Sequence, residues 1–270
     1  VIGFGGYPAL PAMGAAYVMR SPRLIHEQNG VLGRVNELFA RRVHKVACGT
    51  WPTALPDGVD GFPTGNPVRA AVANLAGTPY SPPLMGEGPV SLLVFGGSQG
   101  ATIFARVLPQ ALAQVPAELR ARLRLAHQVR DADRAEVSRA YEALGMTPEL
   151  QPFFEDMPQR LASAHLVICR SGASSVADIT AIGRPSILVP LAIAKRDEQS
   201  ANAAPLAQAG AAFVLTEDAL TPDALARHIT AILSDGDGAA AMAAEAAKLG
   251  RPGAADSLAD LVETVAGHRR

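Results

Sequence analysis

The segment Val90-Ser91-Leu92-Leu93-Val94-Phe95-Gly96-Gly97-Ser98-Gln99-Gly100 joins an apolar run to a glycine-rich turn. The residues after it that recur at helical spacing are all apolar: Ile103, Phe104, Val107, Leu108, Ala111 and Leu112. This pattern predicts a strand over residues 90–95, a tight turn, and a helix with one face against a sheet. Such a turn lets the backbone approach a ligand closely, and the unpaired first-turn amides of a helix attract phosphate. The segment is therefore typical of a phosphate-binding turn, although a purely structural turn fits the same residues.

The same order of strand, small-residue turn and helix recurs along the chain, beginning at residues 1–8 and again at residues 169–175. Apolar runs that predict further strands lie at residues 123–129, 150–154, 166–169, 186–190 and 212–215, and helical patterns lie between them. Residues 31–40 also predict a helix, whereas residues 51–67 and 71–89, rich in proline and glycine, predict a loop and a linker. Alternation of this kind indicates an α/β fold with a parallel, doubly wound sheet.

Composition limits the classes of function. The 270 residues are 49% hydrophobic and 18% charged, which is typical of a globular protein, and no stretch is long and apolar enough to span a membrane. A net charge of −1 does not favour nucleic acid as a partner. Residues 1–70 nevertheless carry seven basic and four acidic residues, which suits an anionic surface or a pyrophosphate, or simply a solvated basic face. Cys48 and Cys169 lie in apolar runs and are predicted to be buried free thiols.

Two groups of polar residues are candidates for ligand contacts. His26-Glu27-Gln28-Asn29 follows a predicted strand, at the edge where parallel sheets bind ligands, although a turn that caps the next helix is the alternative. Asp178 lies one turn inside a predicted helix, where its carboxylate can bind ribose hydroxyls or complement the helix dipole. We see no metal-ligand cluster and expect no cofactor. A nicotinamide-dependent oxidoreductase is disfavoured because the turn is Gly-Gly-x-x-Gly and no acidic residue ends the second strand.

Seven motifs together resemble those of the MurG family of bacterial transferases, in the same order and spacing. They are Gly3-Phe4-Gly5-Gly6-Tyr7, His26-Glu27-Gln28-Asn29, Gly65-Asn66-Pro67-Val68-Arg69, Gly96-Gly97-Ser98-Gln99-Gly100-Ala101, Phe153-Phe154-Glu155-Asp156-Met157, Cys169-Arg170-Ser171-Gly172-Ala173 and Asp197-Glu198-Gln199. The resemblance implies two Rossmann-like domains in the GT-B architecture. It also implies an inverting transferase that moves N-acetylglucosamine from UDP-N-acetylglucosamine to undecaprenyl-pyrophosphoryl-N-acetylmuramyl-pentapeptide, in peptidoglycan synthesis and cell-wall growth.

The resemblance also implies roles for individual residues. His26 is the expected acid-base or acceptor-positioning residue. The residues expected to bind substrate are Asn29, Arg69, Ser98, Gln99, Phe154, Ala173, Ser174, Ser175, Val176, Ala177, Asp178 and Gln199. Two positions depart from the family, which often has Glu in place of Asp178 and His or Gln in place of Glu198. The first change shortens a ribose contact, and the second puts a sugar contact in doubt.

The family's organisation implies three segments. Residues 1–66 are expected to be part of an acceptor domain, residues 67–250 a complete donor domain, and residues 251–270 a helix that returns to the first domain. The chain opens on Val1 in mid-strand, and the family's first glycine-rich loop would precede it, so we expect the N-terminal domain to be incomplete. A UDP-sugar-binding fragment or module without transfer activity is the alternative function.

A membrane surface is a further expected partner. Met13, Tyr17, Arg20 and Arg23 lie on or just after the first predicted helix and could form an apolar and basic patch on the cytoplasmic leaflet of the bacterial cell membrane. A helix that faces the core explains the same pattern.

Overall fold

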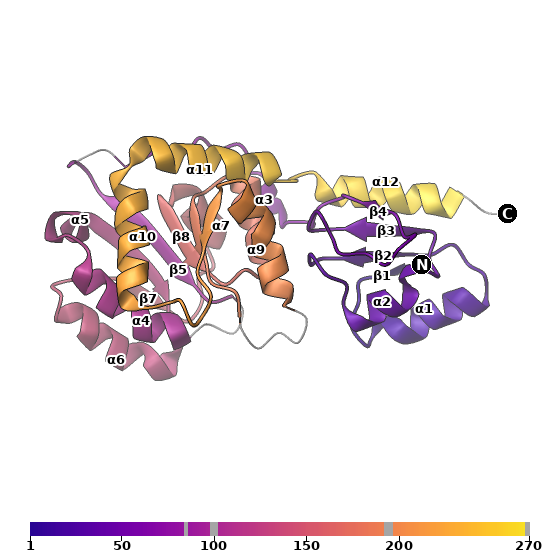
Figure 1. Ribbon diagram of the computed structural model, residues 1–270, viewed down its shortest axis with the longest axis horizontal. Coiled ribbons are helices and arrows are strands. Elements are labelled where there is room, and N and C mark those ends of the chain that lie inside the picture. The colour runs from indigo at the N-terminus through magenta and orange to yellow at the C-terminus, as the bar shows by residue number, and fades with distance from the viewer. Residues whose placement is uncertain (84–85, 98–101, 192–196, 268–270) are drawn as a thin grey trace.

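The computed structural model describes residues 1–83, 86–97, 102–191 and 197–267, and it contains two separate parallel sheets (Figure 1). The first sheet has the strand order β1-β2-β3-β4, and the second has the order β10-β9-β8-β5-β6-β7. We call the first sheet with its helices the N-terminal body and the second with its helices the C-terminal body. No helix among the described residues is both long and apolar enough to cross a membrane.

The N-terminal body is a sheet between two layers of helix (Figure 1). Its elements are β1 (Ile2–Gly3), α1 (Ala9–Val18), β2 (Leu24–Glu27), α2 (Arg34–Ala40), β3 (Lys45–Cys48), β4 (Gly61–Phe62) and α12 (Ala254–Gly267). Met13 of α1 and Phe39 of α2 pack with Ile25 on one face. On the other face, Leu258 and Val265 of α12 pack against Leu24 and Ala47. The last helix of the chain therefore supplies the second covering layer of the first sheet.

The C-terminal body has a core on each face of its sheet. Its strands are β5 (Val90–Phe95), β6 (Leu123–Gln128), β7 (Glu149–Gln151), β8 (Leu166–Cys169), β9 (Ser186–Leu188) and β10 (Ala212–Val214). Its helices are α3 (Ala70–Ala73), α4 (Thr102–Gln114), α5 (Ala117–Arg122), α6 (Asp131–Glu142), α7 (Met157–Ser163), α8 (Ala173–Ile182), α9 (Glu198–Gln208), α10 (Pro222–Ser234) and α11 (Gly236–Leu249). Along β5, Leu92 and Val94 enter one core, and Leu93 and Phe95 enter the other. Both faces are buried, as parallel sheets require.

The central prediction is confirmed: residues 90–95 form β5, and Phe104, Leu108 and Leu112 of α4 are buried in the core on one face of its sheet. The predicted strand over residues 150–154 is wrong at its end, because β7 stops at Gln151. Pro152 follows, and proline has no amide hydrogen to continue the ladder. Phe154 therefore lies in the loop between β7 and α7.

Several other boundaries differ from the sequence prediction. The strand expected over residues 186–190 ends at Leu188, and the linker expected over residues 71–89 overlaps α3, whose Val72 is buried. The helix expected over residues 31–40 begins at Arg34, because Val31 instead forms an isolated bridge with Ala54. The loop expected over residues 51–67 contains β4, which pairs with β3. Cys48 and Cys169 are buried and free, as predicted.

Candidate active site

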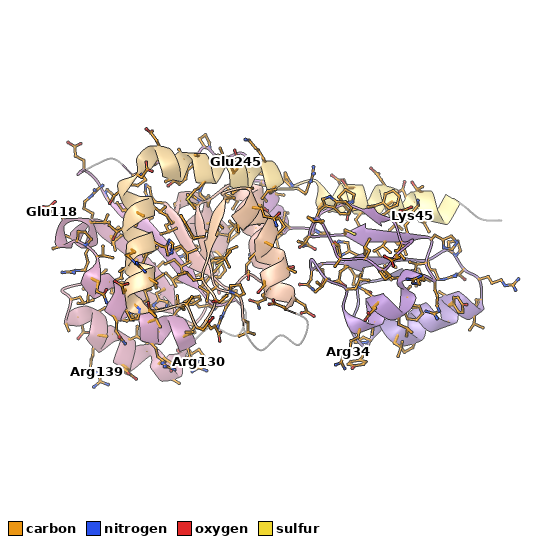
Figure 2. The ribbon with its side chains drawn as sticks, in the orientation of Figure 1. Arg34, Lys45, Glu118, Arg130, Arg139 and Glu245 are labelled. Carbon is orange, nitrogen blue, oxygen red and sulfur yellow. The ribbon has the colours of Figure 1, made fainter. Side chains whose placement is uncertain are left out.

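A cleft lies between the two bodies at the carboxyl ends of β1 and β2. It contains a pocket of about 470 Å³, lined on the N-terminal side by Gly5, Gly6, Asn29 and Arg34 and on the other side by Glu198 of α9. Figure 2 shows Arg34 at the corner of the N-terminal body that is turned toward the C-terminal body. The pocket therefore joins the first glycine turn to the second body.

Asn202 of α9 holds the two sides of the cleft together. Its side chain is fully buried, and its Oδ1 accepts a hydrogen bond from the Gly30 amide at 2.9 Å. Its Nδ2 donates to Asn29 Oδ1 at 3.0 Å and to the Ser171 carbonyl at 3.1 Å. One amide side chain thus connects the turn after β2 with the turn after β8.

Glu27 organises the turn on the N-terminal side. Its Oε1 accepts hydrogen bonds from the backbone amide and the side chain of Asn29, and its Oε2 accepts from the Gly33 amide and Asn36 Nδ2. The side chain is buried, and both oxygens are fully engaged. A carboxylate held in this way is a scaffold for the turn.

His26 is buried beneath this turn, with 1% of its surface exposed, and it does not line the cleft pocket. Its Nε2 lies 3.1 Å from the Gly65 carbonyl, and since a carbonyl only accepts, Nε2 carries the proton. Nδ1 is buried without a partner among the described residues. Burial lowers the pKa of His26, against the opposing effect of the Gly65 hydrogen bond. The imidazole is therefore neutral, with one free acceptor nitrogen.

Asp178 and Arg69 meet at the start of the C-terminal body. Arg69, which precedes α3, places Nη2 3.7 Å from Asp178 Oδ2 in α8. The Asp178 side chain is 17% exposed, and Arg69 is mostly open to solvent. Burial raises the pKa of Asp178, and the Arg69 charge opposes that shift. A largely buried carboxylate with an exposed cation beside it suits the binding of a polar ligand.

The first turn of α8 contains most of the other predicted residues: Ala173, Ser174, Ser175, Val176 and Ala177. No side chain caps this end of the helix, so its first amides are open to an anion. Val176 differs from the others because its side chain is buried in the core. Its amide donates to the Gly172 carbonyl and its carbonyl accepts from Thr180 Oγ1, so its expected ligand contact stays a prediction.

Phe154 and Gln199 flank the same region. The Phe154 ring is buried in the core, which leaves its backbone for a ligand. Gln199 Oε1 accepts from the Leu191 amide at 3.0 Å, so its Nε2 remains a donor. Ser98 and Gln99 lie outside the described residues, and their expected phosphate contacts stay predictions.

Sequence reasoning gave no role to Asn202 or to Arg170. Arg170 forms an ion pair with Glu217, donates to the carbonyls of Val189 and Pro190, and lies over the Phe104 ring. Asn202 carries a usable signal, because it lies three residues after Gln199 and so near the same helix face. Nothing in the sequence pairs Arg170 with Glu217.

In the described parts of the chain, no group of three or more His, Cys, Asp or Glu side chains is close enough to hold a metal ion. The groups that could meet an anion are the first-turn amides of α8, the Arg69 guanidinium beside Asp178, and the Arg34 guanidinium in the cleft pocket. Charge recognition by these groups needs hydrogen-bond donors rather than a coordination shell.

Comparison with known proteins identifies the family. Residues 1–48 match the glycosyltransferase family 28 N-terminal domain, and residues 91–258 match the C-terminal domain of the same family. A UDP-N-acetylglucosamine–N-acetylmuramyl-(pentapeptide) pyrophosphoryl-undecaprenol N-acetylglucosamine transferase from Rhizobium johnstonii is 47% identical over all of this chain. The enzyme of the same name from Rhodopseudomonas palustris is 49% identical over 99% of the chain. The chain spans 72% of the length of each.

Solved structures support the same family assignment. The crystal structure of Acinetobacter baumannii MurG superposes on this chain with a TM-score of 0.81 at 32% sequence identity. The match covers 98% of this chain and 74% of the MurG chain. A UDP-GlcNAc 2-epimerase from Neisseria meningitidis, bound to UDP-GlcNAc, has a TM-score of 0.66 at 11% identity, which shows a shared fold alone. The chain therefore belongs to glycosyltransferase family 28, and within it to the MurG family of N-acetylglucosamine transferases.

Proposed function

We propose that the cleft between the two bodies is the reaction site for transfer of N-acetylglucosamine from UDP-N-acetylglucosamine to undecaprenyl-pyrophosphoryl-N-acetylmuramyl-pentapeptide. This is the reaction for which the curated relatives are named, and it belongs to peptidoglycan synthesis. The observation that carries the proposal is the Asn202 bridge, which sets the polar turn at Asn29 against the starts of α8 and α9. A donor on one side and an acceptor on the other would meet there.

The C-terminal body is the proposed donor side. In this account the open amides of the α8 first turn meet the phosphates, together with Arg69. The Asp178 carboxylate accepts hydrogen bonds from the ribose, and the Phe154 backbone holds the uracil. Gln199 Nε2 donates to a sugar hydroxyl, and Asn29 reaches the sugar from across the cleft. Ser98 and Gln99 extend the phosphate contacts from the turn after β5.

The proposed chemistry is a single in-line displacement with inversion. The acceptor hydroxyl attacks the anomeric carbon as UDP leaves, and the charge that grows on the pyrophosphate is met by fixed amides and by Arg69. The hydroxyl must lose a proton, and Glu27 is fully hydrogen-bonded. We assign the positioning of the acceptor rather than direct proton transfer to His26, because it lies buried beneath the turn at Asn29 and outside the pocket lining.

A transfer assay with a soluble lipid-linked acceptor analogue tests this proposal. We expect product formation, thermal protection by UDP, and no change in that protection when EDTA is added. Protection by UDP without product would support the alternative, a UDP-sugar-binding module. Equal protection by NAD and UDP would overturn the donor assignment. A His26→Gln variant that transfers at the full rate would remove His26 from the mechanism.

The proposed working location is the cytoplasmic face of the cell membrane, where the protein binds peripherally through α1. The exposed apolar side chains there are Leu10, Tyr17, Val18 and Met19, and Arg20 beside them is also exposed. Met13, which the sequence suggested for this patch, is buried against Gly3 instead. Apolar side chains next to a cation are the combination that binds an anionic bilayer surface.

Binding to vesicles that contain anionic lipid tests this surface. We expect Val18→Asp and Arg20→Glu to weaken binding, with Arg139→Glu as a control of equal charge change on α6 of the C-terminal body. Equal loss with Arg20→Glu and Arg139→Glu would indicate a general charge effect and contradict the assignment.

A further inference from the structure

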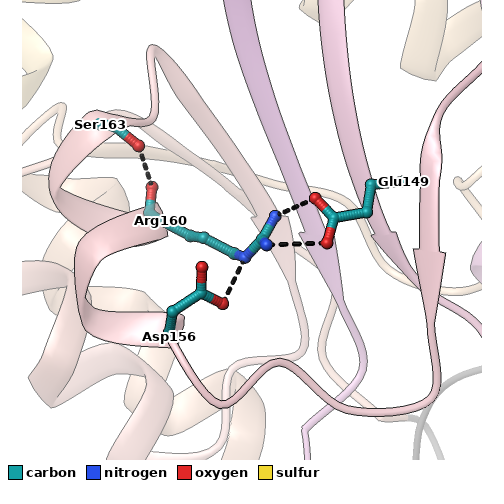
Figure 3. Close-up of polar contacts among 4 residues, drawn as sticks. All are labelled: Glu149, Asp156, Arg160 and Ser163. Carbon is teal, nitrogen blue, oxygen red and sulfur yellow. Dashed lines mark hydrogen bonds and ion pairs between the residues drawn. The ribbon is translucent and has the colours of Figure 1, made fainter.

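Arg160 of α7 is fixed by hydrogen bonds on both sides of the loop that contains Phe154 (Figure 3). Its two terminal nitrogens donate to the two carboxylate oxygens of Glu149 in β7, at 2.7 and 2.8 Å. Its Nε donates to Asp156 Oδ1, just before α7, at 2.6 Å. The guanidinium also lies 4.2 Å from the centre of the Phe154 ring. One side chain therefore contacts the start, the middle and the end of the segment from residue 149 to residue 156.

Packing holds the inner side of this segment, since Leu150 and Phe154 are buried and Gln128 Nε2 donates to the Pro152 carbonyl. The outer side of the segment is the part that Arg160 contacts. β7 is an edge strand of three residues, and it pairs only with β6. The face of β5, β6 and β7 next to Arg160 borders an open pocket of about 670 Å³, and α7 packs mainly on α8 and β5. The Arg160 hydrogen bonds thus join the edge strand to the helix across a gap that no other element fills in the described chain.

The electrostatic environment supports a fixed position for Arg160. Its side chain is 22% exposed, whereas those of Glu149 and Asp156 are 46% and 54% exposed. The hydrogen bond from Arg160 lowers the pKa of Asp156. A bidentate guanidinium–carboxylate pair with a second carboxylate on Nε is the geometry in which an exposed ion pair retains its strength.

We propose that Arg160 is a positioning residue for uracil recognition, because it sets the shape of residues 152–156 and thereby the direction of the Phe154 backbone amide and carbonyl. The inference rests on the proposed function, in which that backbone holds the uracil. Arg160 itself does not touch the nucleotide. Its effect is therefore on binding of the base and not on binding of the phosphates, which are assigned to the turns after β5 and β8.

This separation gives the test. The Kd values of UDP and of inorganic pyrophosphate are measured by titration calorimetry for the protein and for Arg160→Met, which keeps the length of the side chain and removes its charge. We expect UDP to bind about tenfold more weakly, or about 1.4 kcal/mol, with the Kd of pyrophosphate changed by less than about twofold. The KM for UDP-N-acetylglucosamine should rise with little change in kcat.

Three further variants make the test specific. Arg160→Lys keeps the positive charge but cannot form the bidentate pair with Glu149. Asp156→Asn removes the charge of an exposed partner of Arg160 with little risk to folding. Each variant should weaken UDP binding by about threefold. Arg227→Met breaks the exposed Arg227–Asp223 pair on α10 and should leave the UDP affinity unchanged. Equal loss of UDP and pyrophosphate binding in Arg160→Met, or no loss of either, would overturn the inference. Failure of the unaltered protein to bind UDP would overturn the proposed function as well.

Discussion

The N-terminal sheet has four short strands and depends on α12 for one of its two covering layers, whereas the C-terminal sheet has six strands and helices of its own on both faces. The C-terminal body is therefore a self-contained platform. The N-terminal body needs the chain to return after α11 before its second face is buried. The C-terminal body thus buries both faces of its sheet with its own helices, while α12 covers the second face of the N-terminal sheet.

The same contrast appears in the polar groups of the cleft. On the N-terminal side, the Glu27 carboxylate is occupied by the protein's own amides. On the C-terminal side, the first-turn amides of α8 have no side-chain cap and remain open. Open donors attract an anionic ligand, so the difference supports the proposal that the nucleotide binds on the C-terminal side.

Truncation of core side chains should show the largest difference between the two bodies, in their unfolding free energies. Leu108→Ala removes a fully buried side chain from the C-terminal core and should cost about 3–4 kcal/mol of unfolding free energy, while Leu258→Ala on α12 should cost about 2 kcal/mol. Trp51, the single tryptophan, reports the N-terminal body by fluorescence during urea unfolding, and circular dichroism reports mainly the helix-rich C-terminal body. Leu258→Ala should shift the fluorescence transition and Leu108→Ala the dichroism transition. A joint shift in both variants would mean that the bodies unfold as one unit.

Acid should destabilise the C-terminal body through His127. Burial lowers the pKa of His127 to about 3, and its Nδ1 lies 2.9 Å from the Tyr141 hydroxyl. Below the unfolded value of 6.5, the unfolded chain binds a proton that the folded chain does not. The unfolding free energy therefore decreases as the pH is lowered, by about 3 kcal/mol at pH 4. His127→Leu/Tyr141→Phe should abolish this part of the pH dependence. Tyr141→Phe alone should retain it, and a flat profile in that single variant would contradict the assignment.

Loss of the bridge between the bodies should affect transfer more than donor binding. Asn202→Ala leaves the Gly30 amide and the Asn29 side chain without a partner across the cleft, at a cost of about 2 kcal/mol. We expect transfer to slow by more than about tenfold while the Kd of UDP changes by less than about twofold. Asn74→Ala, an exposed asparagine after α3, is the matched control. An equal loss of UDP affinity would show that Asn202 belongs to the donor site alone.

The smallest expected effect concerns the ionisation of Asp178. Its pKa lies above the ordinary 3.8 because of burial, so the carboxyl takes up a proton at a higher pH in the folded chain than in the unfolded chain. Its contribution to folding stability is therefore lost as pH rises through that folded pKa, while UDP affinity should fall as pH drops through it. Asp178→Asn should weaken UDP binding by about tenfold near neutral pH, since a hydrogen bond to a charged group contributes about 1.5–3 kcal/mol. The variant should also show no such pH dependence, and a persistent one would assign it to another group.

The parts of the structure that follow from local sequence were predictable. The apolar run at residues 90–95 and the helical period after it located β5 and α4, because periodicity reports which face of an element is buried. The α8 turn was found in the same way. The end of β7 was missed because the apolar pattern continues through Phe154, although Pro152 ends the ladder.

The two residues to which sequence analysis gave no role, Asn202 and Arg170, depend on long-range geometry. Asn202 meets Asn29 across 173 positions of sequence, and Arg170 meets Glu217 from another element. No local propensity or period encodes such a pair, since both depend on how the packed elements are placed. The motif singled out His26 as a candidate, but its burial and its hydrogen bond to Gly65 required the fold.

Hydrogen–deuterium exchange with and without UDP tests most directly which of the two bodies binds the nucleotide. A donor site on the C-terminal body predicts that saturating UDP slows amide exchange in residues 152–156 and in the first turn of α8, with no change in residues 24–36 of the N-terminal body. Slower exchange in residues 24–36 with none at the start of α8 would contradict it and place the nucleotide on the other side of the cleft.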